Sequence, residues 1–139
     1  MSSGDWSDPR PMSPHLQVWK PHLTMAASIT QRITGVALYF GTFLIAAWIF
    51  ALAMPVQADG APAECYTLIE SVIGSVFGQV VLVLWAAAVL FHFANGIRHL
   101  LWDGPHVGFE PKTASAWSAF NYIFAIVGAV GIWAAATLI

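Results

Sequence analysis

The chain has 139 residues, of which 58% are hydrophobic and only 9% are charged. Soluble domains carry about a quarter charged residues, so this deficit argues against an ordinary soluble protein and indicates a lipid bilayer as the solvent. The net charge of −2 gives no support for a nucleic-acid partner, and the single cysteine, Cys65, can form neither an intrachain disulfide nor a zinc site.

Residues 1–23 form a polar N-terminal segment without the features of a targeting peptide. The segment contains Asp5, Asp8 and several prolines. A secretory signal needs a basic start and an apolar stretch, and a mitochondrial transit peptide needs many arginines and few acids. We expect this segment to belong to the mature protein and to lie on the cytoplasmic side, most simply in a bacterium.

Three apolar stretches follow, and each is long enough to cross a bilayer, whose core takes about 20 residues of helix. The segments between them contain Pro, Gly and Asp, which end helices and turn the chain. The sequence therefore predicts an all-α integral membrane protein, with a transmembrane domain over residues 24–139. The predicted spans are about 24–54, 71–99 and 114–139.

The positive charges all lie on one side of this arrangement. Three precede the long uncharged run of the first span, two lie between the second and third spans, and the loop between the first and second spans carries only acids. The positive-inside rule then places the N-terminus in the cytoplasm and the C-terminus outside. The five cations are Arg10, Lys20, Arg32, Arg98 and Lys112.

His92 is an ionisable group inside the predicted second span, where such groups are costly and need a partner or a purpose. It lies about 9 Å below Arg98 at 1.5 Å rise per residue. One interpretation is a hydrogen bond to a neighbouring helix. The other is ligation of a haem iron, which uses one ring nitrogen and leaves the second free to donate. Gly96, His99 and Trp85 share its helical face, and the glycine would let a flat macrocycle or another helix approach.

If His92 binds haem, a second axial ligand has to come from another chain. The other histidines lie at or outside the cytoplasmic boundary in the predicted topology and do not reach the same depth. The hypothesis therefore predicts an obligate membrane partner with its own histidine. The histidines at the boundary are His15, His22, His99 and His106.

Polar residues also gather at the cytoplasmic rim. Ser28 and Arg32 are four residues apart and share a face, and Asp103 closely follows Arg98 and His99. For the arginines the simpler interpretation is snorkelling to the membrane interface. The alternative is a site for an amphipathic ligand, in which arginine stabilises an anionic group and serine bonds a carbonyl oxygen. Residues 74–78 form a GxxxG, which favours helix packing.

With these residues in view, the chain resembles the cytochrome b membrane-anchor subunit of succinate dehydrogenase. One motif is Arg-Pro-Met-Ser-Pro-His-Leu over residues 10–16, followed by Ser-Ile-Thr-Gln-Arg-Ile-Thr-Gly over residues 28–35. The other is His-Phe-Ala-Asn-Gly-Ile-Arg-His-Leu-Leu-Trp-Asp over residues 92–103. The resemblance covers nearly the whole chain.

The resemblance implies that His92 is an axial ligand of haem b, in a hetero-oligomeric helix bundle. Ser28, Arg32 and Asp103 look like residues of a quinone site. Arg32 also looks like a neighbour of the haem propionates, and His99 looks like a neighbour of the propionates or of the pocket. Gln31 stands where the family usually has histidine; its amide can still donate to a propionate but carries no charge. Pro105 replaces the small residue that is usual after the rim acid.

The implied partners are a second anchor subunit that supplies the other haem ligand, an iron–sulfur subunit and a flavoprotein subunit that oxidises succinate. Electrons would pass from the iron–sulfur subunit to ubiquinone or another quinone, and this chain would have no succinate site of its own. Two alternatives stay open: a structural anchor without haem, and a small transporter or assembly subunit whose histidine relays protons. A fumarate reductase anchor would use the same membrane chemistry in reverse.

Overall fold

The computed structural model describes residues 20–54 and 63–138, and the regular elements in those ranges are all α-helices. Three of the helices are long and apolar enough to cross a membrane by their length and composition. The predicted fold class, an all-α integral membrane protein with three spans, is confirmed. The helices are α1 (Leu23–Leu52), α2 (Glu64–Gly74), α3 (Val76–Asp103) and α4 (Pro111–Leu138), of which α2 is the short one.

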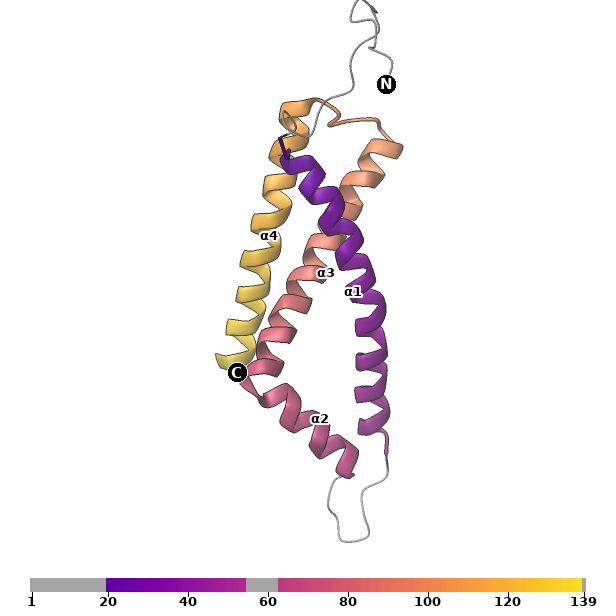
Figure 1. Ribbon diagram of the computed structural model, residues 1–139, viewed down its shortest axis with the longest axis vertical. Helices are drawn as coiled ribbons and strands as arrows, with labels where there is room; N and C mark the ends of the chain where they lie inside the picture. The colour runs from indigo at the N-terminus through magenta and orange to yellow at the C-terminus, as the bar shows by residue number, and fades with distance from the viewer. Residues whose placement is uncertain (1–19, 55–62, 139) are drawn as a thin grey trace, which may run out of the picture.

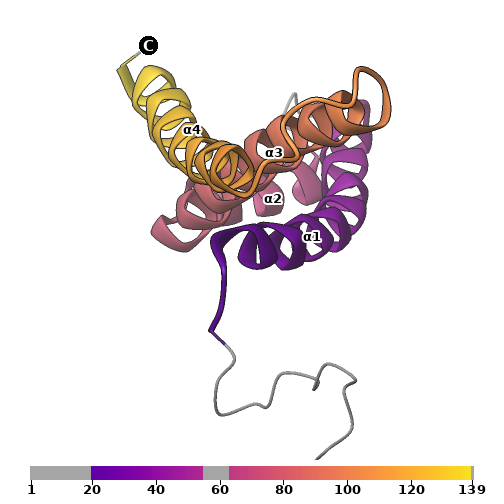
Figure 2. The ribbon, with the colours of Figure 1, turned by 90° about the horizontal axis from the view of Figure 1, so that it is seen from above.

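α3 is the central helix and packs against both α1 and α4 (Figure 2). The start of α1, the end of α3 and the start of α4 lie at one end of the molecule, and α2 lies toward the other (Figure 1). A hydrogen bond of 2.8 Å between the hydroxyls of Thr30 and Tyr122 also ties α1 to α4.

α4 turns a stripe of small residues toward its neighbours. The buried positions recur every three or four residues, which is the spacing of one helical face. Small side chains let two helix backbones approach closely where no hydrophobic effect drives association in lipid. The five buried residues are Ala114, Ser118, Asn121, Ala125 and Ala129.

Two glycines of α1 receive large side chains of α3. A Cβ on Gly41 would collide with the indole of Trp85, and a Cβ on Gly35 would lie 3.2 Å from Cε1 of His92. Both large side chains come from one face of α3, because they are seven residues apart. The close approach of α1 and α3 therefore depends on the missing side chains of these glycines.

The second predicted span is interrupted near its start. At Ser75 the backbone is extended, and its hydroxyl accepts a hydrogen bond from the Gly78 backbone N–H at 3.0 Å, which caps the start of α3. Residues 71–74 thus belong to the separate helix α2, which the sequence did not predict. The two glycines of the GxxxG do not share one helix, because Gly74 ends α2 and Gly78 lies in the first turn of α3. Gly78 still serves close packing, since it is buried and a Cβ there would collide with the α2 backbone at Val72 and Ile73.

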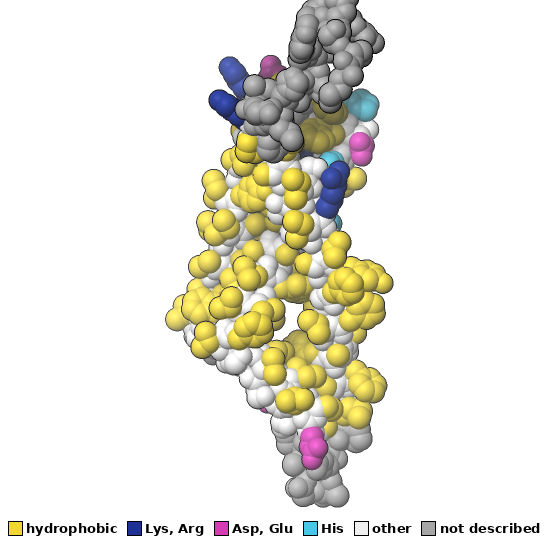
Figure 3. All heavy atoms as spheres, viewed as in Figure 1, with side chains coloured by type: hydrophobic (Ala, Val, Ile, Leu, Met, Phe, Trp, Pro, Cys, Tyr) yellow, Lys and Arg dark blue, Asp and Glu magenta, His cyan; other side chains and the backbone are white. Residues whose placement is uncertain are grey.

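The surface of the described chain is mostly apolar. Large hydrophobic side chains such as Phe40, Leu44 and Phe50 are exposed, and the buried core is a small cluster around Phe91. The Lys and Arg side chains visible in Figure 3 lie toward the end where α1 and α4 begin. Apolar sides with the Lys and Arg side chains at one end are what a membrane-spanning bundle presents to lipid and to the interface.

Candidate functional site

His92 lies on α3 and turns its partly buried ring toward α1. Nδ1 lies 3.2 Å from the hydroxyl oxygen of Thr34, and Nε2 lies 3.3 Å from the side-chain nitrogen of Gln31. The same Gln31 nitrogen donates to the backbone carbonyl of His92 at 3.5 Å. Both ring nitrogens therefore have neutral partners on the neighbouring helix.

These contacts correspond to the helix-to-helix hydrogen bond that was one interpretation of His92. They are also compatible with a metal ligand, because a coordinating histidine normally bonds a polar group through its other ring nitrogen. Within residues 20–54 and 63–138, no three His, Cys, Asp or Glu side chains gather into a metal site.

Gly96, one turn beyond His92, borders space that the described residues leave open. A Cβ built on this glycine would meet no heavy atom within 4 Å. Gly35 and Gly41 are filled by side chains of this chain, whereas the space at Gly96 is not. A flat group or a second helix could approach the backbone there, next to the histidine.

The side-chain nitrogen of Gln31 covers Nε2 of His92. Its carbonyl oxygen Oε1 is buried without a hydrogen-bond partner among the described residues. A buried polar atom without a partner costs free energy. The amide is held here only by the two long contacts of its nitrogen, at 3.3 and 3.5 Å, and the residues present fit a haem at Nε2 once this one side chain has moved.

The expected quinone-site residues are not brought together by the described chain. Ser28 and Arg32 are exposed on α1 beside the face that contacts His92, and Asp103 is the exposed last residue of α3. No side-chain hydrogen bond or ion pair within the described ranges joins these three. His99 is also exposed, with its ring edge-on to Trp102 at 5.2 Å between centroids. The first motif, residues 10–16, lies outside the described residues.

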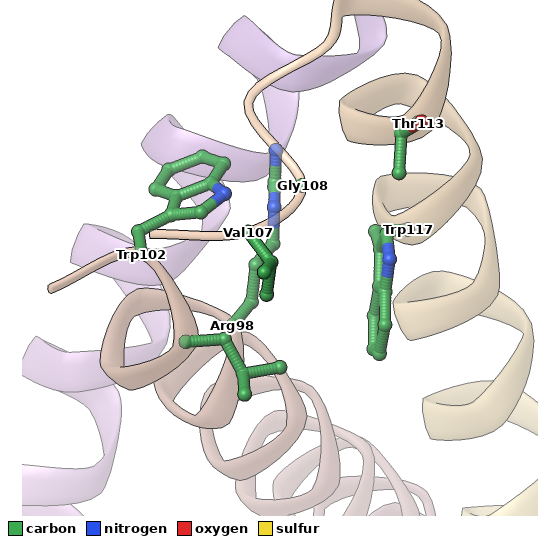
Figure 4. A pocket seen from close by; sticks show the side chains of 7 residues that line it. Arg98, Trp102, Val107, Gly108, Thr113 and Trp117 are labelled. Atoms are coloured by element: carbon green, nitrogen blue, oxygen red, sulfur yellow. The ribbon is translucent and has the colours of Figure 1, made fainter. Parts of the chain in front are cut away.

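A cavity of about 190 Å³ opens near the rim between the end of α3 and the start of α4 (Figure 4). The guanidinium of Arg98 lies 4.2 Å from the centre of the Trp102 ring at one side of it. Neither Ser28, Arg32 nor Asp103 contributes to its wall. The cavity is lined by Arg98, Leu101, Trp102, Val107, Gly108, Thr113 and Trp117.

The snorkelling interpretation of Arg98 is wrong, because its side chain is only 4% exposed and points between α3 and α4. Nη1 donates to the Ser118 hydroxyl at 2.9 Å and to Oδ1 of Asn95 at 3.5 Å. Asn121 donates to the same Asn95 oxygen at 3.2 Å. We call these four residues the α3–α4 polar cluster.

Sequence reasoning missed three of the four cluster residues: Asn95, Ser118 and Asn121. A signal was present, since Asn95 and Arg98 are three residues apart on one helix and Ser118 and Asn121 are three apart on the next. Polar pairs at this spacing on two adjacent spans can hydrogen-bond across the helix interface.

Three apolar spans with a histidine within the bundle and cations at one end define the class: a small multi-pass helical membrane protein with a polar site between its helices. The chain belongs to the succinate dehydrogenase/fumarate reductase transmembrane subunit family, whose model matches residues 7–132. The predicted resemblance is thereby confirmed.

Curated relatives agree with this assignment. The chain is 34% identical to the succinate dehydrogenase cytochrome b556 subunit of Rickettsia bellii (strain RML369-C), over 89% of this chain and 90% of the relative. Identity is also 34% with the cytochrome b556 subunit of Paracoccus denitrificans, over 85% and 88% of the two chains. The mitochondrial cytochrome b560 subunit of Mus musculus is 38% identical, over 70% of this chain and 54% of the relative.

Proposed function

We propose that this chain is the cytochrome b membrane anchor of a succinate dehydrogenase, in which His92 is an axial ligand of haem b. It forms part of the site where a quinone receives electrons from the iron–sulfur subunit. The chain binds no succinate; its contribution is to hold the complex in the bilayer and to provide one half of the haem site.

The observation that carries this proposal is the setting of His92. Its ring lies inside a span and bonds only neutral groups, and open space lies one turn away at Gly96. A neutral imidazole with one anchored nitrogen is the form that ligates haem iron. The bound haem would supply reversible one-electron chemistry at this depth in the membrane.

The other proposed site residues of this chain contact the haem propionates or line the quinone pocket. Arg32 would neutralise the propionates at the cytoplasmic rim, His99 would lie beside them or beside the pocket, and the amide of Gln31 would donate there after it leaves His92. Arg32, Ser28 and Asp103 form this chain's part of the quinone pocket. Arginine polarises a quinone oxygen and the serine hydroxyl hydrogen-bonds a carbonyl oxygen, since charge-assisted bonds are the stronger ones. The exposure of Ser28, Arg32 and Asp103 supports a pocket that other subunits complete.

The location follows from the same proposal. The chain lies in the cytoplasmic membrane with its N-terminus and the α3–α4 connection in the cytoplasm, which is the side favoured by its Lys and Arg residues. A second anchor subunit supplies the opposite haem ligand, and the iron–sulfur and flavoprotein subunits dock at the cytoplasmic rim.

The test is a dithionite-reduced minus oxidised visible spectrum of the tagged complex purified from native membranes. We expect a b-type haem spectrum that is lost or altered in His92→Ala. The matched control is His22→Ala, which removes an exposed histidine just before α1 and should leave the spectrum unchanged. A parent complex that retains its soluble subunits but shows no haem would instead support the structural-anchor alternative.

A further inference from the structure

We propose that the hydroxyl of Thr34 is a positioning group that sets the tautomer of His92. It accepts a hydrogen bond from Nδ1–H and so leaves the lone pair on Nε2, the nitrogen that faces away from Thr34 toward Gln31. The tautomer follows from contacts within this chain alone. Its use in ligating haem rests on the proposed function.

The first argument is the proton count of the Thr34 hydroxyl, which has one proton and three polar neighbours. The hydroxyl oxygen lies 2.8 Å from the backbone carbonyl of Thr30, 3.1 Å from that of Gln31 and 3.2 Å from Nδ1 of His92. The shortest contact is the usual i−4 bond of a helical threonine, in which the hydroxyl donates its proton to the carbonyl of Thr30. Its lone pair then faces Nδ1, and Nδ1 must carry the proton.

The second argument comes from the other side of the ring. The side-chain amide nitrogen of Gln31 faces both Nε2 and the backbone carbonyl of His92. An amide nitrogen is a donor only, so Nε2 has to accept and carries no proton. The reversed amide would bring its oxygen against the His92 carbonyl, an acceptor. Both sides of the ring thus favour the same tautomer, and the closer contact, to the Thr34 hydroxyl, is the one that sets it.

The surroundings of Thr34 keep its hydroxyl in place against the His92 ring. It is only 8% exposed, so water does not compete for its hydroxyl. The backbone of α1 fixes the hydroxyl, and Gly35 lets the ring approach to within reach of it. An Nδ1–H that donates to an acceptor makes the imidazole a more basic ligand and fixes its orientation, and loss of such a partner typically costs 10- to 100-fold in metal affinity.

The first experiment measures the tautomer without haem. The full-length chain with ¹⁵N-labelled histidine, purified without haem in lipid bilayers, is studied by NMR, which distinguishes protonated from unprotonated ring nitrogens. The His92 signals are assigned by their loss in His92→Ala. We expect Nδ1 protonated and Nε2 unprotonated in the parent, and a shift toward protonated Nε2 in Thr34→Val. A parent with protonated Nε2 would overturn the proposal.

The second experiment measures the haem of the whole complex in Thr34→Val, which keeps the shape of threonine without its hydroxyl. We expect a weaker ligand to ferric iron and therefore a higher haem midpoint potential. A tenfold change in preference corresponds to about 59 mV for one electron. Thr34→Ser retains the hydroxyl and should restore the parental potential and low-spin EPR spectrum.

The outcomes separate the two proposals. Parental potential and EPR spectrum in Thr34→Val would reject the role of Thr34 and leave His92 as a ligand. A parent complex without haem would reject the proposed function, while the NMR result still decides the tautomer. If Thr34→Val does not accumulate, Thr34→Ala removes the same hydroxyl without branched bulk and is compared with Thr34→Ser in its place.

Discussion

The guanidinium of Arg98 on α3 donates to the hydroxyl of Ser118 on α4 at 2.9 Å, and both side chains are almost completely buried. Asn95 and Asn121 form a second link 3.2 Å long between the same helices. Hydrogen bonds between spans contribute about 0.6–2 kcal/mol each. The α3–α4 polar cluster therefore holds the two helices in one register.

Removing the Ser118 hydroxyl should loosen this pair of helices. We expect Ser118→Ala to lower the stability of the complex by about 1–3 kcal/mol, because Arg98 loses its nearest acceptor in a buried site. Thermal denaturation of the detergent-solubilised complex measures the change. Ser115→Ala is the control on the same helix, since that hydroxyl bonds only the Pro111 carbonyl within its own helix. Equal destabilisation by both changes would argue against the cluster.

A methyl group at Gly41 should separate α1 from α3, because a Cβ there collides with the Trp85 indole. We expect Gly41→Ala to cost about 1–3 kcal/mol as overpacking and to reduce accumulation of the chain in membranes. The second change Trp85→Leu should relieve the loss. Gly131→Ala, where a Cβ meets nothing within 4 Å, should accumulate like the parent. If Trp85→Leu does not restore accumulation of Gly41→Ala, the collision with the indole is not the cause of the loss.

A large side chain at Gly96 tests what occupies the open space beside His92. We expect Gly96→Leu to leave the packing within this chain intact, since a Cβ there touches nothing, but to lower haem content or assembly with the second anchor. Haem per complex and co-purification of subunits measure the two effects. Gly131→Leu is the matched control, and normal haem and assembly in both variants would mean that nothing approaches Gly96.

Arg32 tests the quinone part of the proposed function. We expect Arg32→Leu to reduce succinate-dependent quinone reduction by about 10- to 100-fold, as loss of a charge-assisted hydrogen bond would. Succinate oxidation with an artificial soluble acceptor should be unchanged. Lys20→Leu removes another exposed cation, just before the start of α1, and should retain both activities. Loss of both activities in Arg32→Leu would indicate an assembly defect instead.

The spans could be predicted from the sequence because hydropathy depends only on residue type. The break at Ser75 could not, because the apolar pattern continues across it and the decision depends on a local cap. Residues 64–74 consequently appeared as part loop and part span, and the structure makes them a separate helix.

The sequence was enough to predict which residues belong to the candidate site, but only partly which neighbours their side chains contact. The cost of an imidazole in a span identified His92, but the partners Gln31 and Thr34 depend on which helix faces it. Arg98 shows the limit more clearly. An arginine near a membrane boundary normally extends its charged end into water. Here Arg98 is buried, and its nearest partner is Ser118 on the adjacent helix, which the sequence alone does not place beside it.

The α3–α4 polar cluster also bears on biogenesis. A lone α3 in lipid would carry an arginine and an asparagine without the partners that α4 provides, and such groups raise the free energy of membrane insertion. When α4 lies alongside, Ser118 and Asn121 supply hydrogen bonds to Arg98 and Asn95 and so lower this cost. The last two spans are therefore inserted at lower cost together, as a helical hairpin, than one after the other.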